Sequence, residues 1–179
     1  MNRGRAWGDK DHAHTDSGQV NRLVNKQKWA ELAQLVAKFP EGAKVVDKLN
    51  QDMLPIHRAL LKGASTELIE KLVEIHPDGL MQGDANGMLP LHYACIYSYC
   101  TEKGYMKLHN PMIADSHGHV LKLLLKIRPL AAKEIDQDGR TPLHCAASSK
   151  ACALSVMDLL KEHDAASARR TKLGKLPLH

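Results

Sequence analysis

Apolar residues return along the chain with the spacing of short amphipathic helices. From Ser155 to Glu162 they recur at i, i+3 and i+4, which is the spacing of one apolar face of an α-helix. A shorter apolar stretch, Leu143 to Ser149, precedes this segment and also favours a helix. The segment contains the apolar pair Leu159-Leu160, and a similar pair, Leu72-Val73, stands earlier in the chain. The pattern therefore predicts an all-α protein built from pairs of short helices.

A proline-histidine tetrapeptide marks the period of this pattern. The four copies are Leu54-Pro55-Ile56-His57, Leu89-Pro90-Leu91-His92, Thr141-Pro142-Leu143-His144 and Leu176-Pro177-Leu178-His179. Their prolines are 35, 52 and 35 residues apart, so the middle interval contains an insertion of about 17 residues. Five residues before the last three histidines stand Gly87, Gly139 and Gly174, and Asp52 takes this place in the first copy. Markers that keep one register indicate a repeat architecture.

Each unit is predicted to contain a tight turn followed by two helices. The glycine supplies the positive φ that such a turn requires. The proline then occupies the first turn of a helix, where its missing N–H costs nothing. Neither helix of a unit can bury its apolar face alone, so we expect the units to stack and to form a continuous core.

The unit resembles the ankyrin repeat, in which Thr-Pro-Leu-His is followed by a small-residue helix, a turn and a Leu-rich helix; Thr141 to His144 matches this signature outright. The resemblance implies an ankyrin-repeat solenoid of stacked helix-turn-helix units with short turn or hairpin connections. It also assigns a structural role to twelve motif residues. These are Pro55, His57, Gly87, Pro90, His92, Gly139, Thr141, Pro142, His144, Gly174, Pro177 and His179.

Three copies depart from the family pattern, because Leu54, Leu89 and Leu176 replace the threonine. In the family this threonine caps the helix and bonds the histidine, and loss of such a cap costs about 0.5–2 kcal/mol. We expect burial of the leucine to recover part of this cost. The histidine of these copies is expected to find a backbone partner instead.

The repeat register divides the chain into a tail and one repeat domain. Residues 1–17 are polar and are predicted to form a disordered tail, and residues 18–179 are predicted to form the ankyrin repeat domain. The predicted units are a degenerate N-terminal unit at about 18–49, repeats at about 50–84, 85–136 and 137–171, and a truncated repeat at 172–179. The insertion falls at about 98–116 of the second repeat. Because the last unit stops before its helices, we expect this chain to be a fragment of a longer array.

Composition and charge narrow the class of protein. Apolar residues make up 44% and charged residues 25% of the chain, as in ordinary globular proteins. The net charge is +5, and the densest basic group is Arg169, Arg170, Lys172 and Lys175. We interpret this group as a solvated basic face and expect no nucleic acid partner. The sequence contains neither a signal peptide pattern nor a membrane-spanning apolar run, so we predict a cytoplasmic protein, with the nucleus as the alternative.

No motif predicts catalysis, a cofactor or a metal site. The sequence contains no phosphate-binding P-loop, no dinucleotide-binding glycine pattern and no nucleophile elbow. Cys95, Cys100, His109, His117 and His119 carry atoms that zinc prefers, but their spacing matches no structural zinc pattern. We therefore expect neither a cofactor nor a metal, and no enzymatic activity.

The insertion is the most individual segment of the chain. All four tyrosines, Tyr93, Tyr97, Tyr99 and Tyr105, fall in it or beside it. Tyrosine is enriched at binding hot spots, and long loops between helices commonly carry specificity. The alternative is a tolerated surface loop whose tyrosines pack back on the helices.

The resemblance implies a binding face made by the turn tips and by the exposed ends of the first helices. The candidate partner-binding residues are Leu61, Lys62, Ala85, Asn86, Met88, Ile96, Tyr97, Tyr99, Tyr105, Gln137, Asp138, Arg140, Ser148, Ser149, Lys172 and Lys175. Their mixture of apolar, acidic and basic groups favours a protein surface over a phosphate backbone. The sequence thus predicts a protein-interaction scaffold or adaptor that binds through its concave face and the insertion. The alternative is a regulatory repeat segment of a larger enzyme whose catalytic domain lies beyond this chain.

Overall fold

The computed structural model describes residues 10–97, 111–148, 158–159, 161 and 167–177. The elements are α1 (Lys10–Asn25), α2 (Trp29–Lys38), η1 (Pro40–Lys44), α3 (Pro55–Leu61), α4 (Thr66–Ile75), η2 (Pro77–Met81), α5 (Pro90–Tyr97), α6 (Pro111–Ile127), η3 (Pro129–Lys133) and α7 (Pro142–Ser148). The η elements are 3₁₀-helices. Within these residues there is no named strand, so the predicted all-α class is confirmed.

Helices α3, α5 and α7 each begin at the proline of the repeated tetrapeptide. A proline is well suited to this first helical position because its fixed φ matches the helix and no N–H is wasted. The second helix of a unit is amphipathic, and in α4 it buries Leu68, Ile69, Leu72 and Val73. The predicted pairing of a short apolar helix with a longer amphipathic one is therefore present in α3–α4 and α5–α6.

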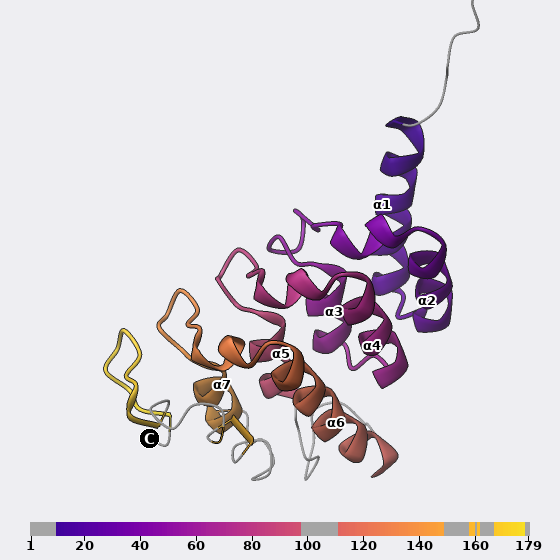
Figure 1. Ribbon diagram of the computed structural model, residues 1–179. Coiled ribbons are helices and arrows are strands. Elements are labelled where there is room, and N and C mark those ends of the chain that lie inside the picture. The colour runs from indigo at the N-terminus through magenta and orange to yellow at the C-terminus, as the bar shows by residue number, and fades with distance from the viewer. Residues whose placement is uncertain (1–9, 98–110, 149–157, 160, 162–166, 178–179) are drawn as a thin grey trace, which may run out of the picture.

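The helices form two layers that run side by side along the stack (Figure 1). In the inner layer α3 packs on α5 and α5 packs on α7, while in the outer layer α2 packs on α4 and α4 packs on α6. The core lies between the layers, where Leu72, Leu91, Leu124 and Leu143 are almost fully buried. Hairpin loops project from one edge of the stack just before α3, α5 and α7, and a further hairpin lies at the C-terminal end (Figure 1).

A short 3₁₀-helix closes the units after the outer helix, and the repeat analysis did not predict it. The three segments begin at Pro40, Pro77 and Pro129. Each buries a small or apolar side chain, such as Ala43 or Leu80. The signal in the sequence was the recurrence of these prolines at intervals of 37 and 52 residues.

Two helices begin earlier than the sequence boundaries suggest. Helix α1 begins at Lys10, so the predicted end of the polar tail at residue 17 falls inside this helix. Helix α6 begins at Pro111, so the last part of the predicted insertion, 111–116, lengthens the outer helix. In each case buried apolar residues anchor the later turns of the helix, and the helix continues from them toward the N-terminus. Residues 1–9 and 98–110 lie outside the described residues.

The turn glycines adopt the predicted left-handed conformation, with φ of 73° at Gly87, 78° at Gly139 and 74° at Gly174. Asp52, which replaces glycine in the first hairpin, also has a positive φ of 55°. For residues other than glycine this conformation costs roughly 1–2 kcal/mol. The first hairpin therefore carries a cost that the other three avoid.

Replacement of Gly139 by alanine is expected to lower the free energy of unfolding by about 2 kcal/mol or more. The new Cβ would be strained by its positive φ and would lie 3.0 Å from the backbone nitrogen of Lys172. The matched control is Gly174→Ala, which has the same type of φ but no atom within 4 Å of the new Cβ, and it should lose only about 1 kcal/mol. Urea unfolding of both variants measures the difference. Equal losses would mean that contact with the next hairpin contributes nothing.

Candidate functional site

The hairpin tips form one continuous row along the edge of the stack, here called the tip row (residues 48–52, 85–88, 137–140 and 172–175). Backbone hydrogen bonds join each tip to the next. They run from Ala85 N to Gln51 O (2.7 Å), from Gln137 N to Asn86 O (2.9 Å) and from Lys172 N to Asp138 O (2.9 Å). These bonds fix the spacing of the tips, so the exposed side chains stand on a rigid backbone rather than on independent loops.

A buried carboxylate holds the base of the second and third hairpins. Asp84 Oδ1 accepts the N–H groups of Asn86 (2.8 Å) and Met88 (2.9 Å). Asp136 Oδ1 accepts those of Asp138 (2.9 Å) and Arg140 (2.8 Å) in the same way. Sequence reasoning missed these residues, although the signal was present as an aspartate three residues before Gly87 and Gly139.

The first and fourth hairpins vary this arrangement. In the first, Asp47 Oδ1 accepts the N–H of Leu49 at 3.2 Å. In the fourth, a threonine stands at the corresponding position, and Thr171 Oγ1 accepts the N–H of Lys175 at 3.2 Å. Four hairpins therefore share one anchoring position, but only three of them place a carboxylate there.

The repeated histidine caps the start of each inner helix. His57 Nδ1 accepts the N–H of Leu54 at 3.0 Å, His92 Nδ1 that of Leu89 at 3.1 Å, and His144 Nδ1 that of Thr141 at 3.1 Å. In the third unit the threonine hydroxyl also lies 2.9 Å from His144 Nδ1. The histidines that follow Leu54 and Leu89 thus bond a backbone partner, as expected. A leucine costs these helices the hydroxyl contact but not the histidine cap.

Two of these histidines, His92 and His144, also tie their inner helix to the following hairpin. Since Nδ1 is an acceptor, Nε2 carries the proton, and it donates to Arg140 O from His92 and to Lys175 O from His144, both at 3.2 Å. His57 differs, because its buried Nε2 has no hydrogen-bond partner among the described residues. Burial lowers the pKa of His57 to about 4 against the attraction of Asp84, and burial also lowers the pKa of His92. Both rings are therefore neutral in the folded protein near neutral pH.

The third unit matches a known family of repeats. The ankyrin repeat family model matches residues 138–171, from the tip of the third hairpin through α7 to the anchor of the fourth. The chain contains an ankyrin repeat. Ankyrin repeats are protein–protein interaction modules and are generally not catalytic. A search of curated proteins found no match to this chain. The ankyrin-type contacts of hairpin, proline and histidine recur at α5 and α3, outside the matched residues.

The structure places most of the predicted tip residues on the surface. Ala85, Gln137, Lys172 and Lys175 are exposed, and the side chain of Asp138 is 72% exposed. Other predicted positions are held by neighbours. The amide of Asn86 donates to Gln51 Oε1 at 3.1 Å, and the guanidinium of Arg140 bonds the carboxylates of Asp136 (2.7 Å) and Asp138 (3.3 Å).

The predicted helix positions lie at the C-terminal ends of the inner helices. Leu61, Lys62 and Ile96 are half-buried, and Ser148 is exposed. The hydroxyl of Ser148 donates to the carbonyl of His144 at 2.8 Å. These ends offer less free side-chain surface to a partner than the tips do.

Met88 and Tyr93 are buried, although the sequence analysis placed Met88 on the binding face and Tyr93 beside the insertion. Met88 follows the turn glycine but is only 7% exposed, because its N–H bonds Asp84 and its side chain joins the core cluster. Tyr93 is buried and its hydroxyl donates to Asp84 Oδ2 at 2.7 Å, as the alternative of packed tyrosines expects. The side chain of Tyr97 lies outside the described residues. The same is true of Tyr99, Tyr105, Ser149 and His179.

Exposed apolar side chains on the hairpins were largely missed by sequence reasoning. Leu49 is 95% exposed on the first hairpin, Leu173 is 83% exposed on the fourth, and Ile135 is 41% exposed beside the third tip. The available signal was a single apolar residue within an otherwise polar hairpin, as in Lys48-Leu49-Asn50. The hairpins therefore present apolar as well as polar groups.

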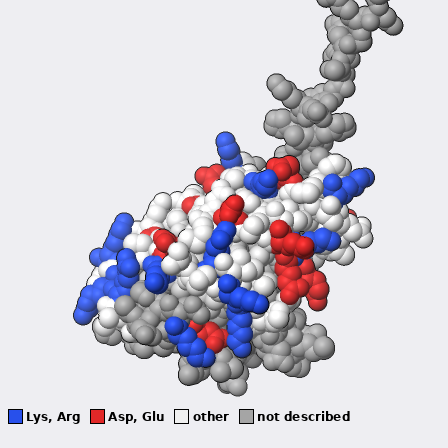
Figure 2. Space-filling model, viewed as in Figure 1, with Lys and Arg blue, Asp and Glu red and all other residues white. Residues whose placement is uncertain are grey.

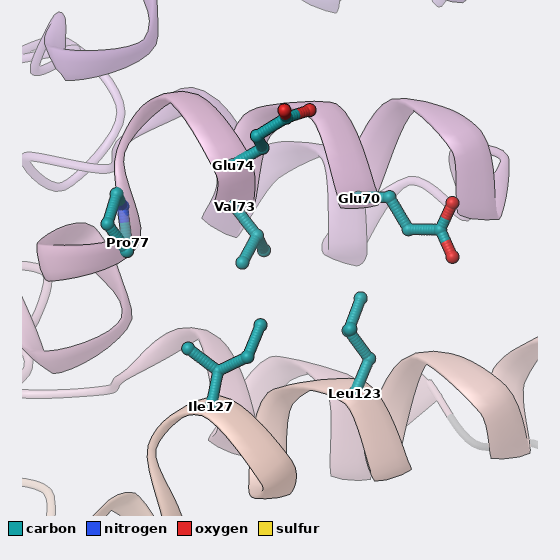
Figure 3. A pocket seen from close by; sticks show the side chains of 6 residues that line it. All are labelled: Glu70, Val73, Glu74, Pro77, Leu123 and Ile127. Atoms are coloured by element: carbon teal, nitrogen blue, oxygen red, sulfur yellow. The ribbon is translucent and has the colours of Figure 1, made fainter.

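A hollow of about 420 Å³ lies between the outer helices α4 and α6, away from the tip row. Figure 3 shows Val73 pointing from α4 toward Leu123 and Ile127 of α6, with the Glu74 carboxylate turned away from these apolar side chains and the Glu70 carboxylate beside them. Two exposed polar contacts lie nearby: Glu70 of α4 meets His119 of α6 at 3.3 Å, and Asp78 of η2 pairs with Arg128, which follows α6, at 2.6 Å. Such exposed pairs contribute little to stability. No predicted site residue lines this hollow.

The histidines and cysteines considered as zinc ligands lie apart from one another or outside the described residues. Among the described side chains, no group of three histidine, cysteine or acidic residues could hold a metal ion. His119 lies against Glu70, and Cys95 is buried, which raises the pKa of its thiol. Cys100, His109 and the side chain of His117 are outside the described residues. No helix in the described part of the chain has the length and apolar character needed to cross a membrane.

Proposed function

We propose that this protein is a scaffold or adaptor that grips a protein partner along the tip row and the adjoining ends of the inner helices. The observation that carries the proposal is the hydrogen-bonded ladder of hairpins from Gln51 to Lys172. A surface that is already ordered before binding loses little conformational entropy when a partner docks. Buried thiols at Cys95 and Cys145 suit a reducing compartment, and we propose the cytoplasm or the nucleus.

The side chains on this ladder favour a protein partner. Exposed groups include the apolar Leu49 and Ile135, the amide of Gln137 and the carboxylate of Asp138. A phosphate backbone is recognised chiefly by cations, whereas protein interfaces combine apolar, amide and charged contacts. We propose that Tyr97 at the end of α5 and Tyr99 and Tyr105 of the insertion extend this surface.

Site-specific photocrosslinking tests the location of the binding surface. A photoreactive residue at Gln137 or Ala85 is expected to capture a defined partner in cells, since both side chains are exposed on the tip row. The matched control carries the same group at Lys122, an exposed position on the outer helix α6. Partner capture from Lys122 alone would contradict the proposed face. Equal capture from all three positions would contradict it as well.

A competing substitution sharpens this experiment. Asp138→Arg reverses an exposed charge in the middle of the tip row, where the carboxylate is 72% exposed, and should lower capture from Ala85 several-fold. Reversal of a rim charge acts mainly on the association rate, so the effect is expected to grow at low ionic strength. The same reversal at Glu67 of α4, which is also exposed, should leave capture unchanged. An unchanged yield in the Asp138→Arg variant would argue against contact at the third tip.

A further inference from the structure

The fourth hairpin differs in charge from the hairpins before it. Residues 169–175 contain four cations, Arg169, Arg170, Lys172 and Lys175, and no acidic residue. The corresponding segment of the third hairpin, 134–140, contains three acidic residues and only one cation. All four cations are exposed, and Figure 2 shows basic side chains gathered over this end of the stack, at the left of the view. The end of the tip row is therefore strongly positive.

The third hairpin also has a cation at this place, and there it is neutralised within the hairpin. Arg140 stands directly after the turn glycine, and its guanidinium bonds Asp136 (2.7 Å) and Asp138 (3.3 Å). Lys175 stands directly after the turn glycine of the fourth hairpin. Thr171 replaces the anchoring aspartate there, and its neutral hydroxyl accepts the Lys175 N–H at 3.2 Å. In the described part of the chain no carboxylate pairs with Lys172 or Lys175. The fourth hairpin has a cation where the third has Arg140, but it lacks the carboxylates that pair with Arg140.

We propose that an acidic peptide segment of the partner supplies these carboxylates, so that the fourth hairpin binds Asp- or Glu-rich sequence. This inference rests on the proposed function and names the partner chemistry at one end of the tip row. The exposed side chain of Leu173 stands between Lys172 and Lys175 and is 83% exposed. A segment that alternates acidic and apolar residues would pair with both lysines and cover this leucine. Complementary charge of this kind raises association rates and is weakened by salt.

The neighbouring tip favours a peptide over a nucleic acid. The carbonyl of Asp138 accepts the Lys172 N–H at 2.9 Å, so the two tips are adjacent. The carboxylate of Asp138 is 72% exposed and would repel a phosphate backbone that continued along the row. Leu173 likewise offers a contact that a phosphate chain cannot use.

Binding of a labelled peptide of alternating glutamate and leucine, measured by fluorescence anisotropy, tests the inference. We expect saturable binding that weakens as salt is raised, and no comparable binding of the peptide in which glutamine replaces glutamate. The double variant Lys172→Glu/Lys175→Glu should weaken binding at least about tenfold, or 1.4 kcal/mol. The control Lys122→Glu/Lys126→Glu changes the net charge equally on α6 and should bind like the original protein. Equal loss in both variants would overturn the inference in favour of a nonspecific charge effect.

Two substitutions of Thr171 test whether a carboxylate within the fourth hairpin can replace those of the peptide. Thr171→Asp places a carboxylate where Asp136 stands in the third hairpin, and it should compete with the peptide and weaken binding several-fold while raising the unfolding temperature. Thr171→Asn provides a similar shape without charge and should retain binding. Unchanged peptide binding in the Thr171→Asp variant would overturn the inference.

A single-stranded RNA oligonucleotide serves as the competing probe. If the RNA binds as tightly as the peptide, and the lysine variant abolishes its binding, the hairpin is a nucleic acid site and the inference fails. Loss of peptide binding with intact capture from Gln137 would remove only the acidic partner class. Loss of both would remove the proposed scaffold function as well.

Discussion

Replacement of Arg58 by alanine is expected to destabilise the protein by about 3–5 kcal/mol. The side chain of Arg58 is only 3% exposed, and it forms an ion pair with Asp47, which is 4% exposed. Its guanidinium also donates to Asn21 Oδ1 at 3.3 Å and to Asn25 Oδ1. The substitution would leave the buried Asp47 carboxylate without its cation, and the half-buried Asn21 amide would lose a donor. Urea or thermal unfolding followed by circular dichroism measures the loss.

An exposed ion pair provides the control for this prediction. Arg128 pairs with Asp78, whose side chain is 85% exposed, so Arg128→Ala should cost no more than about 1 kcal/mol. Replacement of both partners, in Arg58→Met/Asp47→Leu, should recover part of the loss because no buried charge is left alone. If Arg58→Ala costs no more stability than Arg128→Ala, the contacts of Arg58 with Asp47, Asn21 and Asn25 do not hold α1 to the first hairpin.

Acidification from pH 6.5 to pH 4 is expected to remove about 3 kcal/mol of stability through His57 alone. Burial lowers the pKa of His57 to about 4, from the ordinary value of 6.5. Between these values the unfolded chain binds a proton that the folded chain does not, so the free energy of unfolding falls as the pH falls. The contribution is fully present above pH 6.5 and is lost as the pH approaches 4. His92, whose pKa burial also lowers, acts in the same direction.

His57→Gln isolates this effect. His57 accepts the N–H of Leu54 from the third position of α3, where a glutamine side chain can form the same cap without a titrating group. Chemical unfolding at a series of pH values should give a shallower decline for the variant than for the original protein. Parallel curves for the two proteins would contradict the proposed origin of the acid sensitivity.

Local repeat patterns carried most of the fold. Pro55, Pro90 and Pro142 marked the starts of the inner helices, and Gly87 and Gly139 marked the turns. Both signals act through backbone geometry within a few residues, so they can be read from the chain alone. The starts of α1 and α6 could not be read in this way, because residues 10–17 are polar and residues 111–116 fall in the segment that interrupts the repeat register.

The candidate site was predicted less completely than the fold. The tips at Ala85, Gln137 and Lys172 were placed on the surface as expected, but Met88 is buried and Leu49 is exposed. Exposure of a hairpin side chain depends on which way the turn directs it and on how the next hairpin covers it. Neither property follows from residue type.

The sequence by itself determined the period, the helix starts, the turn glycines and the mixed chemistry of the tips, since each depends on short-range geometry or on residue identity. Only the tertiary structure decided which groups meet across units. Arg58 pairs with Asp47 and bonds two asparagines of α1. His92 and His144 donate to carbonyls of the following hairpin. Arg140 pairs with two carboxylates of the third hairpin, whereas Lys175 has no such partner among the described residues of the fourth. These relations depend on the stacking of neighbouring units, which brings side chains more than thirty residues apart into contact.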